Sequence, residues 1–173
     1  MPFPYYQRLS RARKRTYQKS DAIEALRLPA DHGLTAPAEK LATALQDEDK
    51  KQVTRLCGQL AQGICAQLDT PTLTIRVLSK RPSDEWEELH GLYEPEDNGK
   101  PAKITVWMRT AQRRQVVAYR TFLRTLLHEI CHHLDYEHLK LDESFHTAGF
   151  YKRESSLFRQ LVPQKDPVQE SLF

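Results

Sequence analysis

The segment 126–161 constrains the fold and the function of this chain more than any other part of it. It holds five of the seven histidines, and residues 128–132 form the sequence His-Glu-Ile-Cys-His, an H-E-x-x-H motif. On an α-helix, residues four apart lie on one face about one turn from each other, so His128 and His132 can bind one metal ion. Glu129 lies between them and can reach a water at that metal. We therefore expect a helix whose histidine face looks toward a cleft.

The composition is typical of one globular domain. The chain has 173 residues, of which 39% are hydrophobic and 28% are charged. No apolar run approaches the roughly 20 residues that span a bilayer, and the basic N-terminus lacks the apolar region of a secretory signal. Three scattered cysteines are too few for a disulfide framework. We expect a cytoplasmic protein with reduced thiols and no membrane partner.

The charge is divided unevenly along the chain. Residues 1–20 carry six bases and no acid, which leaves 20 bases and 23 acids in the remainder, a net charge of −3 against +3 for the whole chain. We interpret residues 1–20 as a basic N-terminal arm, residues 21–162 as a single domain, and residues 163–173 as a disordered C-terminal tail. Cations beside phosphates release counterions, and the tyrosines of the arm can stack on exposed bases. The residues expected to contact nucleic acid are Arg11, Arg13, Lys14 and Arg15. A solvated, partly helical tail is the alternative.

The hydrophobic period predicts helices in the first part of the domain and strands after them. A short helix is expected from Ser20 or Asp21 to Leu28, and apolar residues at helical spacing predict helical structure over 38–68. Alternation and β-branched residues then predict three strands. These strands are expected at residues 72–78, 86–93 and 103–108.

A long helix that contains the H-E-x-x-H motif is predicted from about Thr110, with a continuous buried stripe along it. A loop near 139–144 separates it from a last helix, which Thr147 caps and Pro163 ends. The expected fold class is therefore α+β. It consists of a small antiparallel three-stranded sheet packed on the motif helix, with N-terminal helices and a C-terminal helix.

A catalytic zinc has three protein ligands and one open position, so a third ligand is needed. His138 gives the spacing of metzincins, which place a glycine where this chain has Asp135, and on a continued helix it faces away from the first two histidines. Glu143 lies in the expected loop without a supporting pattern. His146 precedes the helix capped by Thr147, whose N-terminus can bring it over the motif. We favour His146 and keep His138 as the alternative.

The segment LLHEICHH, followed by FHTAGFYKRESSLFRQL, resembles the SprT-like (Spartan-type) zinc metalloproteases over about residues 70–162. In that family a third histidine opens the helix after the motif, with an aromatic residue a few positions on, and His146 and Phe150 match this order. The sequence HTAG departs from the glycine and proline that the family commonly shows around this histidine. The resemblance implies a minimal zincin-like metalloprotease fold and Zn²⁺ bound by His128, His132 and His146.

The implied reaction is peptide-bond hydrolysis by a zinc-activated water, with Glu129 as the general base. An extended edge strand that contains Ile104, Val106 and Met108 is expected to hold a protein or peptide substrate by β-augmentation. Asp135 is expected to orient a ligand histidine, and Tyr151 is a candidate for stabilising the oxyanion.

The chain ends with a second short motif, Gln-Glu-Ser-Leu-Phe. It is similar to the bacterial sliding-clamp-binding peptide, Gln-x-[Ser/Asp]-Leu-Phe, which docks its Leu-Phe pair in an apolar pocket. The residues expected to bind the clamp are Gln169, Ser171, Leu172 and Phe173. Spartan-type proteases degrade proteins crosslinked to DNA and are recruited by a replication clamp. The resemblance therefore implies a zinc endopeptidase in DNA repair that acts on DNA-bound or DNA-crosslinked proteins.

Two other functions fit parts of the sequence. A metal-dependent endoribonuclease would use His128, His132 and His138, but the family with that spacing lacks the motif glutamate, so Glu129 argues against it. A non-enzymatic, DNA-associated zinc adaptor would use the arm and the tail, with the metal only structural.

Overall fold

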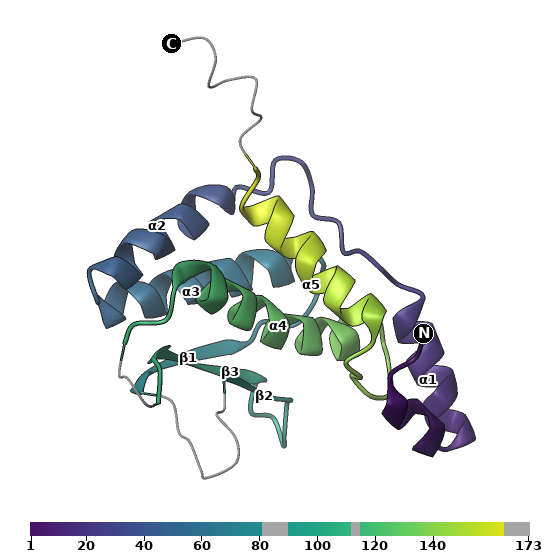
Figure 1. Ribbon diagram of the computed structural model, residues 1–173. Coiled ribbons are helices and arrows are strands. Elements are labelled where there is room, and N and C mark those ends of the chain that lie inside the picture. Colours follow the sequence, from purple (N-terminus) through teal and green to yellow (C-terminus); the bar gives the residue numbers. More distant parts are fainter. Residues whose placement is uncertain (81–89, 112–114, 165–173) are drawn as a thin grey trace.

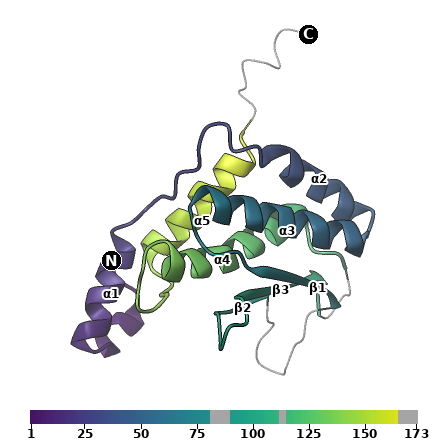
Figure 2. The same ribbon diagram turned by 180° about the vertical axis from the view of Figure 1, so that it is seen from behind.

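The computed structural model describes residues 1–80, 90–111 and 115–164. The described elements, in chain order, are η1 (Pro4–Arg8), α1 (Arg11–Asp21), α2 (Thr35–Gln46), α3 (Lys50–Gln67), β1 (Thr74–Lys80), β2 (Gly91–Glu94), β3 (Lys103–Arg109), α4 (Tyr119–Glu137) and α5 (Ala148–Leu161). Helices α3 and α4 cover one face of the sheet, and α2 and α5 pack on their other side (Figures 1 and 2). The α+β class is confirmed. None of the described helices is both long and apolar enough to cross a membrane.

The sheet has the strand order β1-β3-β2 and is mixed. Strand β1 pairs with β3 in parallel, and β2 pairs with β3 in antiparallel. The prediction of an antiparallel sheet is therefore wrong for one of the two pairs. The parallel pairing places α3 and α4 together on the same face of the sheet, where both contact its strands.

The prediction that Ile104, Val106 and Met108 form an edge strand is wrong. They belong to β3, the central strand, whose main-chain groups are already paired with strands on both sides. All five residues from Ile104 to Met108 are buried, which is the pattern of a strand covered on both faces. Strand β3 therefore has no free edge for a peptide, and the described edge strands are β1 and β2.

Two predicted helices have other bounds in the structure. The expected helix up to Leu28 does not form, because this stretch runs extended and its main chain bonds to the side chain of Gln160 in α5. The motif helix α4 begins at Tyr119 instead of Thr110, because the chain before it continues alongside β3, with Val117 N–H donating to the carbonyl oxygen of Met108. The predicted helical region 38–68 is confirmed as α2 and α3.

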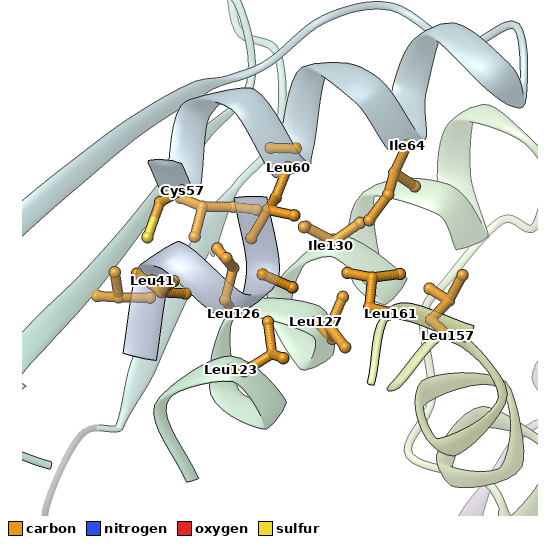
Figure 3. Close-up of a cluster of buried hydrophobic side chains, with 14 of the residues drawn as sticks. Leu41, Cys57, Leu60, Ile64, Leu123, Leu126, Leu127, Ile130, Leu157 and Leu161 are labelled. Atoms are coloured by element: carbon orange, nitrogen blue, oxygen red, sulfur yellow. The ribbon is translucent and has the colours of Figure 1, made fainter. Parts of the chain in front are cut away.

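Helix α4 lies at the centre of the hydrophobic core. Its side chains at positions 123, 126, 127 and 130 are fully buried between α2, α3 and α5, as the close-up in Figure 3 shows. The labelled side chains there are Leu41, Cys57, Leu60, Ile64, Leu123, Leu126, Leu127, Ile130, Leu157 and Leu161. Burial of each such side chain contributes about 1.5–3 kcal/mol. The helix that carries the H-E-x-x-H motif is therefore fixed by its apolar face.

The segment predicted as a basic arm is folded against the domain. Residues Pro4–Arg8 and Arg11–Asp21 are helical, and the side chains of Tyr17 and Ser20 are buried. Helix α1 lies beside the start of α5 (Figure 1). Residues 3–21, called the N-terminal segment below, are therefore packed against the structure that carries the motif, while η1 and the outer face of α1 remain largely exposed.

Gly149 allows the end of α1 to approach α5, which gives a testable prediction. A Cβ atom at this position would lie 2.4 Å from the main-chain oxygen of Asp21, a contact that a rigid backbone cannot relieve. We expect Gly149→Ala to lower the free energy of unfolding by about 1–3 kcal/mol, measured by urea denaturation.

Gly58→Ala in the middle of α3 is the matched control. A Cβ atom there would meet nothing within 4 Å, so the change should be neutral or stabilise by up to about 1 kcal/mol through helix propensity. Equal effects of the two substitutions would contradict the close approach of α1 and α5.

Candidate metal centre

Three histidines from α4 and from the loop before α5 converge on one point. The rings of His128 and His132 have centroids 5.0 Å apart, and the ring of His146 lies 4.8 and 4.9 Å from them. The Nε2 atom of His146 lies 3.0 Å from the Nε2 atoms of both other histidines. The three side chains together form a group that can hold a metal ion. The structure thus brings together the three ligands that the sequence favoured, and we call them the metal centre.

Hydrogen bonds on the far side of two rings fix their tautomers. His128 Nδ1 lies 3.0 Å from Glu154 Oε2, and because a carboxylate only accepts, Nδ1 carries the proton. The hydroxyl of Ser144 donates to Asp135 Oδ2 at 2.8 Å, so it accepts from His132 Nδ1 at 2.7 Å. A neutral imidazole has one donor and one acceptor, so both Nε2 atoms present lone pairs to the shared point. Lone pairs that converge in this way fit a metal ion.

The surroundings of His132 and His146 favour their uncharged forms. The pKa of His132 is lowered to about 3, mainly by burial and in addition by the neighbouring His128 and His146. Burial also lowers the pKa of His146, with His128 as the second cause. The neutral form of imidazole is the one that binds metal, so these two side chains are suited to coordination.

Asp135 supports His132 through an intermediate residue. The sequence predicts that Asp135 orients a ligand histidine, and in the structure Ser144 lies between Asp135 and His132 and relays the contact. The other oxygen of Asp135 accepts from Arg153 Nη2 at 2.9 Å, and both side chains are fully buried. The guanidinium of Arg153 also donates to the carbonyl oxygen of Ser20. The second ligand is thus held by a chain of polar contacts that reaches α1.

Glu129 follows His128 on α4 and is buried, with 7% of its surface exposed. Its pKa is raised to about 6, mainly by burial and in addition by Glu154, although His128 and a main-chain hydrogen bond from Tyr93 act in the opposite direction. Gly91 in β2 approaches so closely that a Cβ atom there would lie 2.7 Å from Glu129 Oε1. A carboxyl group with a pKa near neutrality can both accept and release a proton.

Aromatic side chains surround the metal centre. The ring of Phe150 lies 4.9, 4.8 and 5.2 Å from the rings of His128, His132 and His146. Tyr151 lies beside the centre with its ring 5.9 Å from that of His146, and 42% of its surface is exposed. Its predicted role at an oxyanion stays a prediction.

The other candidate ligands lie elsewhere. His138 follows the end of α4, and its Nδ1 atom is 3.1 Å from the main-chain oxygen of Leu68. Glu143 accepts two hydrogen bonds from Arg13, at 2.7 and 2.8 Å. Neither belongs to the group of residues that can hold the metal. The buried His133 contacts Pro71 and so is no part of the centre either.

Glu154 and Ser144 are the functional residues that the sequence reasoning missed. A signal for Glu154 was present, because it lies four residues after Phe150 and so on the same face of α5. Ser144 lies in a loop of irregular conformation, where no spacing rule indicates which side chain reaches His132. Both residues act by orienting a ligand histidine.

The residues predicted to bind nucleic acid all lie on α1 but have different surroundings. Arg13 pairs with Glu143, and Lys14 Nζ lies 5.3 Å from the centre of the Tyr6 ring. Arg11 and Arg15 are exposed. The predicted clamp-binding residues Gln169, Ser171, Leu172 and Phe173 lie outside the described residues.

Comparison of the chain with family models, with curated proteins and with solved structures found no match. The interpretation of the metal centre therefore depends on its own geometry and on the chemistry of its donors. Three imidazoles that face one point are a donor set that can hold a metal ion.

Replacement of the third histidine distinguishes the two ligand sets that the sequence left open. We expect His146→Ala to weaken zinc affinity by more than about 100-fold. Replacement of a residue that only orients a ligand already weakens metal affinity about 10–100-fold, and loss of a ligand itself should cost more. His138→Ala is the matched control and should leave zinc affinity unchanged, because its ring contacts the Leu68 carbonyl instead. Zinc content after dialysis and competition with a chelator measure both. Loss of zinc affinity in His138→Ala but not in His146→Ala would instead identify His138 as the third ligand.

Proposed function

We propose that this protein is a zinc-dependent endopeptidase in which His128, His132 and His146 hold Zn²⁺ and Glu129 is the general base. The observation that carries the proposal is the convergence of three Nε2 atoms, with the buried Glu129 next to the first of these histidines on α4. Structural zinc sites take four protein ligands, whereas the group found among the described residues has three. The donor set therefore favours a catalytic metal over the adaptor with a structural zinc.

Each residue has a definable task in this reaction. A bound zinc ion would lower the pKa of its water and polarise the carbonyl group of the scissile bond. Glu129 takes the proton from the attacking water and later delivers it to the leaving amine, and its raised pKa suits both steps. Glu154 and the Ser144–Asp135 pair hold the imidazoles in the tautomers that expose Nε2.

Strand β2 takes the place of β3 as the proposed substrate-binding edge. It is an edge strand among the described elements, and Gly91 brings its main chain against Glu129. A peptide that adds to an open edge receives main-chain hydrogen bonds whatever its sequence. We therefore propose that substrates bind along β2, with the scissile bond close to Glu129.

The endoribonuclease alternative requires His138 as a ligand. Its ring is turned to the carbonyl oxygen of Leu68 and lies outside the histidine group. The position of Glu129 beside the metal centre also matches hydrolysis with a carboxylate base. The geometry thus favours the peptidase.

The general-base role predicts that loss of the Glu129 carboxylate separates catalysis from metal binding. We expect Glu129→Gln to lower the rate of peptide cleavage by about 10²–10⁴-fold, because the variant cannot accept the proton. Zinc affinity should stay within a few-fold of wild type. A quenched fluorescent peptide or an unfolded protein substrate measures the rate.

Glu137→Gln is the matched control on the same helix, since Glu137 pairs only with Lys140 among the described residues. It should retain the wild-type rate. If Glu129→Gln cleaved peptides at the wild-type rate, the proposed role of Glu129 as general base would be wrong.

We further propose that the protein works on DNA-bound or DNA-crosslinked proteins. Arg11, Arg15 and Lys19 recur every four residues on α1, so they share one face, and all three are exposed. Within the described parts of the chain none of them has an acidic partner in an ion pair. Such a face suits phosphates. Recruitment by a sliding clamp through the C-terminal peptide stays a prediction.

The basic face predicts a salt-dependent contact with DNA. We expect the double variant Arg11→Gln/Arg15→Gln to bind DNA several-fold more weakly and to reduce the salt slope of log affinity by about 2. Fluorescence anisotropy with a labelled duplex at two salt concentrations measures both. The control is Lys50→Gln/Lys51→Gln at the start of α3, which removes the same amount of charge from another place. It should change neither the DNA affinity nor its salt dependence.

A further inference from the structure

The third ligand is held differently from the first two. His128 and His132 are fixed by the packed helix α4, whereas His146 lies on the irregular loop between α4 and α5. A side chain on a loop has more conformational freedom to lose when it binds a metal than one on a packed helix. The affinity of the metal centre therefore depends on what restrains this loop.

Tyr5 restrains the main chain of the ligand itself. Its hydroxyl group donates to the carbonyl oxygen of His146 at 3.0 Å, across 141 residues of sequence. The ring of Tyr5 also packs against that of Phe145, with centroids 6.4 Å apart. The contact fixes the peptide unit that follows the ligand side chain.

Arg13 restrains the loop three residues earlier. Two nitrogen atoms of its guanidinium contact the two carboxylate oxygens of Glu143, at 2.7 and 2.8 Å, in a bidentate geometry. The same guanidinium lies 5.4 Å from the centre of the Phe145 ring. Phe145 in turn packs on the buried ring of Tyr17. Three of the four residues from 143 to 146 are thus contacted by the N-terminal segment.

The other end of the N-terminal segment is anchored to the helix that follows the loop. The main-chain N–H of Gly149 donates to Asp21 Oδ1 at 3.0 Å, and the hydroxyls of Ser20 and Thr147 lie 3.4 Å apart. Arg153 donates to the carbonyl oxygen of Ser20 at 2.6 Å. The segment is therefore fixed at α5, and from there it reaches back over the loop.

From these contacts we propose that the N-terminal segment positions the third metal ligand, with Tyr5 and Arg13 as positioning residues that set zinc affinity. This gives the residues interpreted from sequence as a nucleic-acid-binding arm a second role. The inference rests on the metal centre and does not require the peptidase reaction.

The test compares zinc affinity in full-length variants by competition with a chromogenic chelator. We expect Tyr5→Phe and Arg13→Gln each to weaken zinc affinity by about fivefold, as loss of one or two restraining hydrogen bonds implies. Tyr6→Phe is the control for the first, because the Tyr6 hydroxyl accepts from Gln18 inside the segment. Arg15→Gln is the control for the second. Both controls should bind zinc like wild type.

A second measurement separates positioning from general stability. Urea unfolding of the metal-free proteins should show similar stability for Tyr5→Phe and Tyr6→Phe, whereas only Tyr5→Phe loses zinc affinity. The charge reversal Arg13→Glu should weaken zinc binding further, and Arg13→Glu/Glu143→Arg should restore most of it. The absorption spectrum of bound Co²⁺ should change in Tyr5→Phe and stay unchanged in Tyr6→Phe.

Zinc affinity within twofold of wild type in both Tyr5→Phe and Arg13→Gln would overturn the inference, as would equal losses in their controls. A wild-type protein that binds zinc but cleaves no peptide would contradict the proposed function and leave this inference standing. The two proposals therefore fail on different measurements.

Discussion

The buried ion pair between Arg153 and Asp135 connects most of the parts that form the metal centre. Both side chains are fully buried, and an unpaired charge at either position costs about 3–5 kcal/mol. Asp135 reaches His132 through Ser144, and Arg153 holds the carbonyl oxygen of Ser20 at the end of α1. The ion pair therefore fixes the relative positions of helix α4, helix α5 and the N-terminal segment. Because these elements carry or contact the three histidines, it also helps to fix the positions of the histidines.

The three histidines of the metal centre could be chosen from local patterns in the sequence. The spacing of His128 and His132 places them on one helix face, and the cap at Thr147 indicates that α5 begins directly after His146. The apolar period also predicted α2, α3 and the buried face of α4. These features depend on residues close in sequence, for which helical spacing and capping rules suffice.

The features that sequence reasoning got wrong or missed depend on contacts distant in sequence. The run from Ile104 to Met108 is apolar except for Thr105, a sign of a central strand, yet its pairing with β1 and β2 is decided by the whole fold. The extended chain up to Leu28 is held by Gln160, so tertiary contacts override its helical pattern. Likewise, the charge of residues 1–20 suggested an independent arm, and nothing in its composition reveals that Tyr5 reaches His146.

The contact between the two ends of the domain affects how the protein matures. During synthesis, residues 3–21 leave the ribosome well before α4 and the loop with His146. Among the described residues, the hydrogen bonds that join the N-terminal segment to distant parts of the chain go to residues 143–153, which emerge much later. A nascent chain that already displays the H-E-x-x-H helix therefore lacks an ordered third ligand. The three histidines of the metal centre would therefore come together only once the N-terminal segment has packed against the loop and α5.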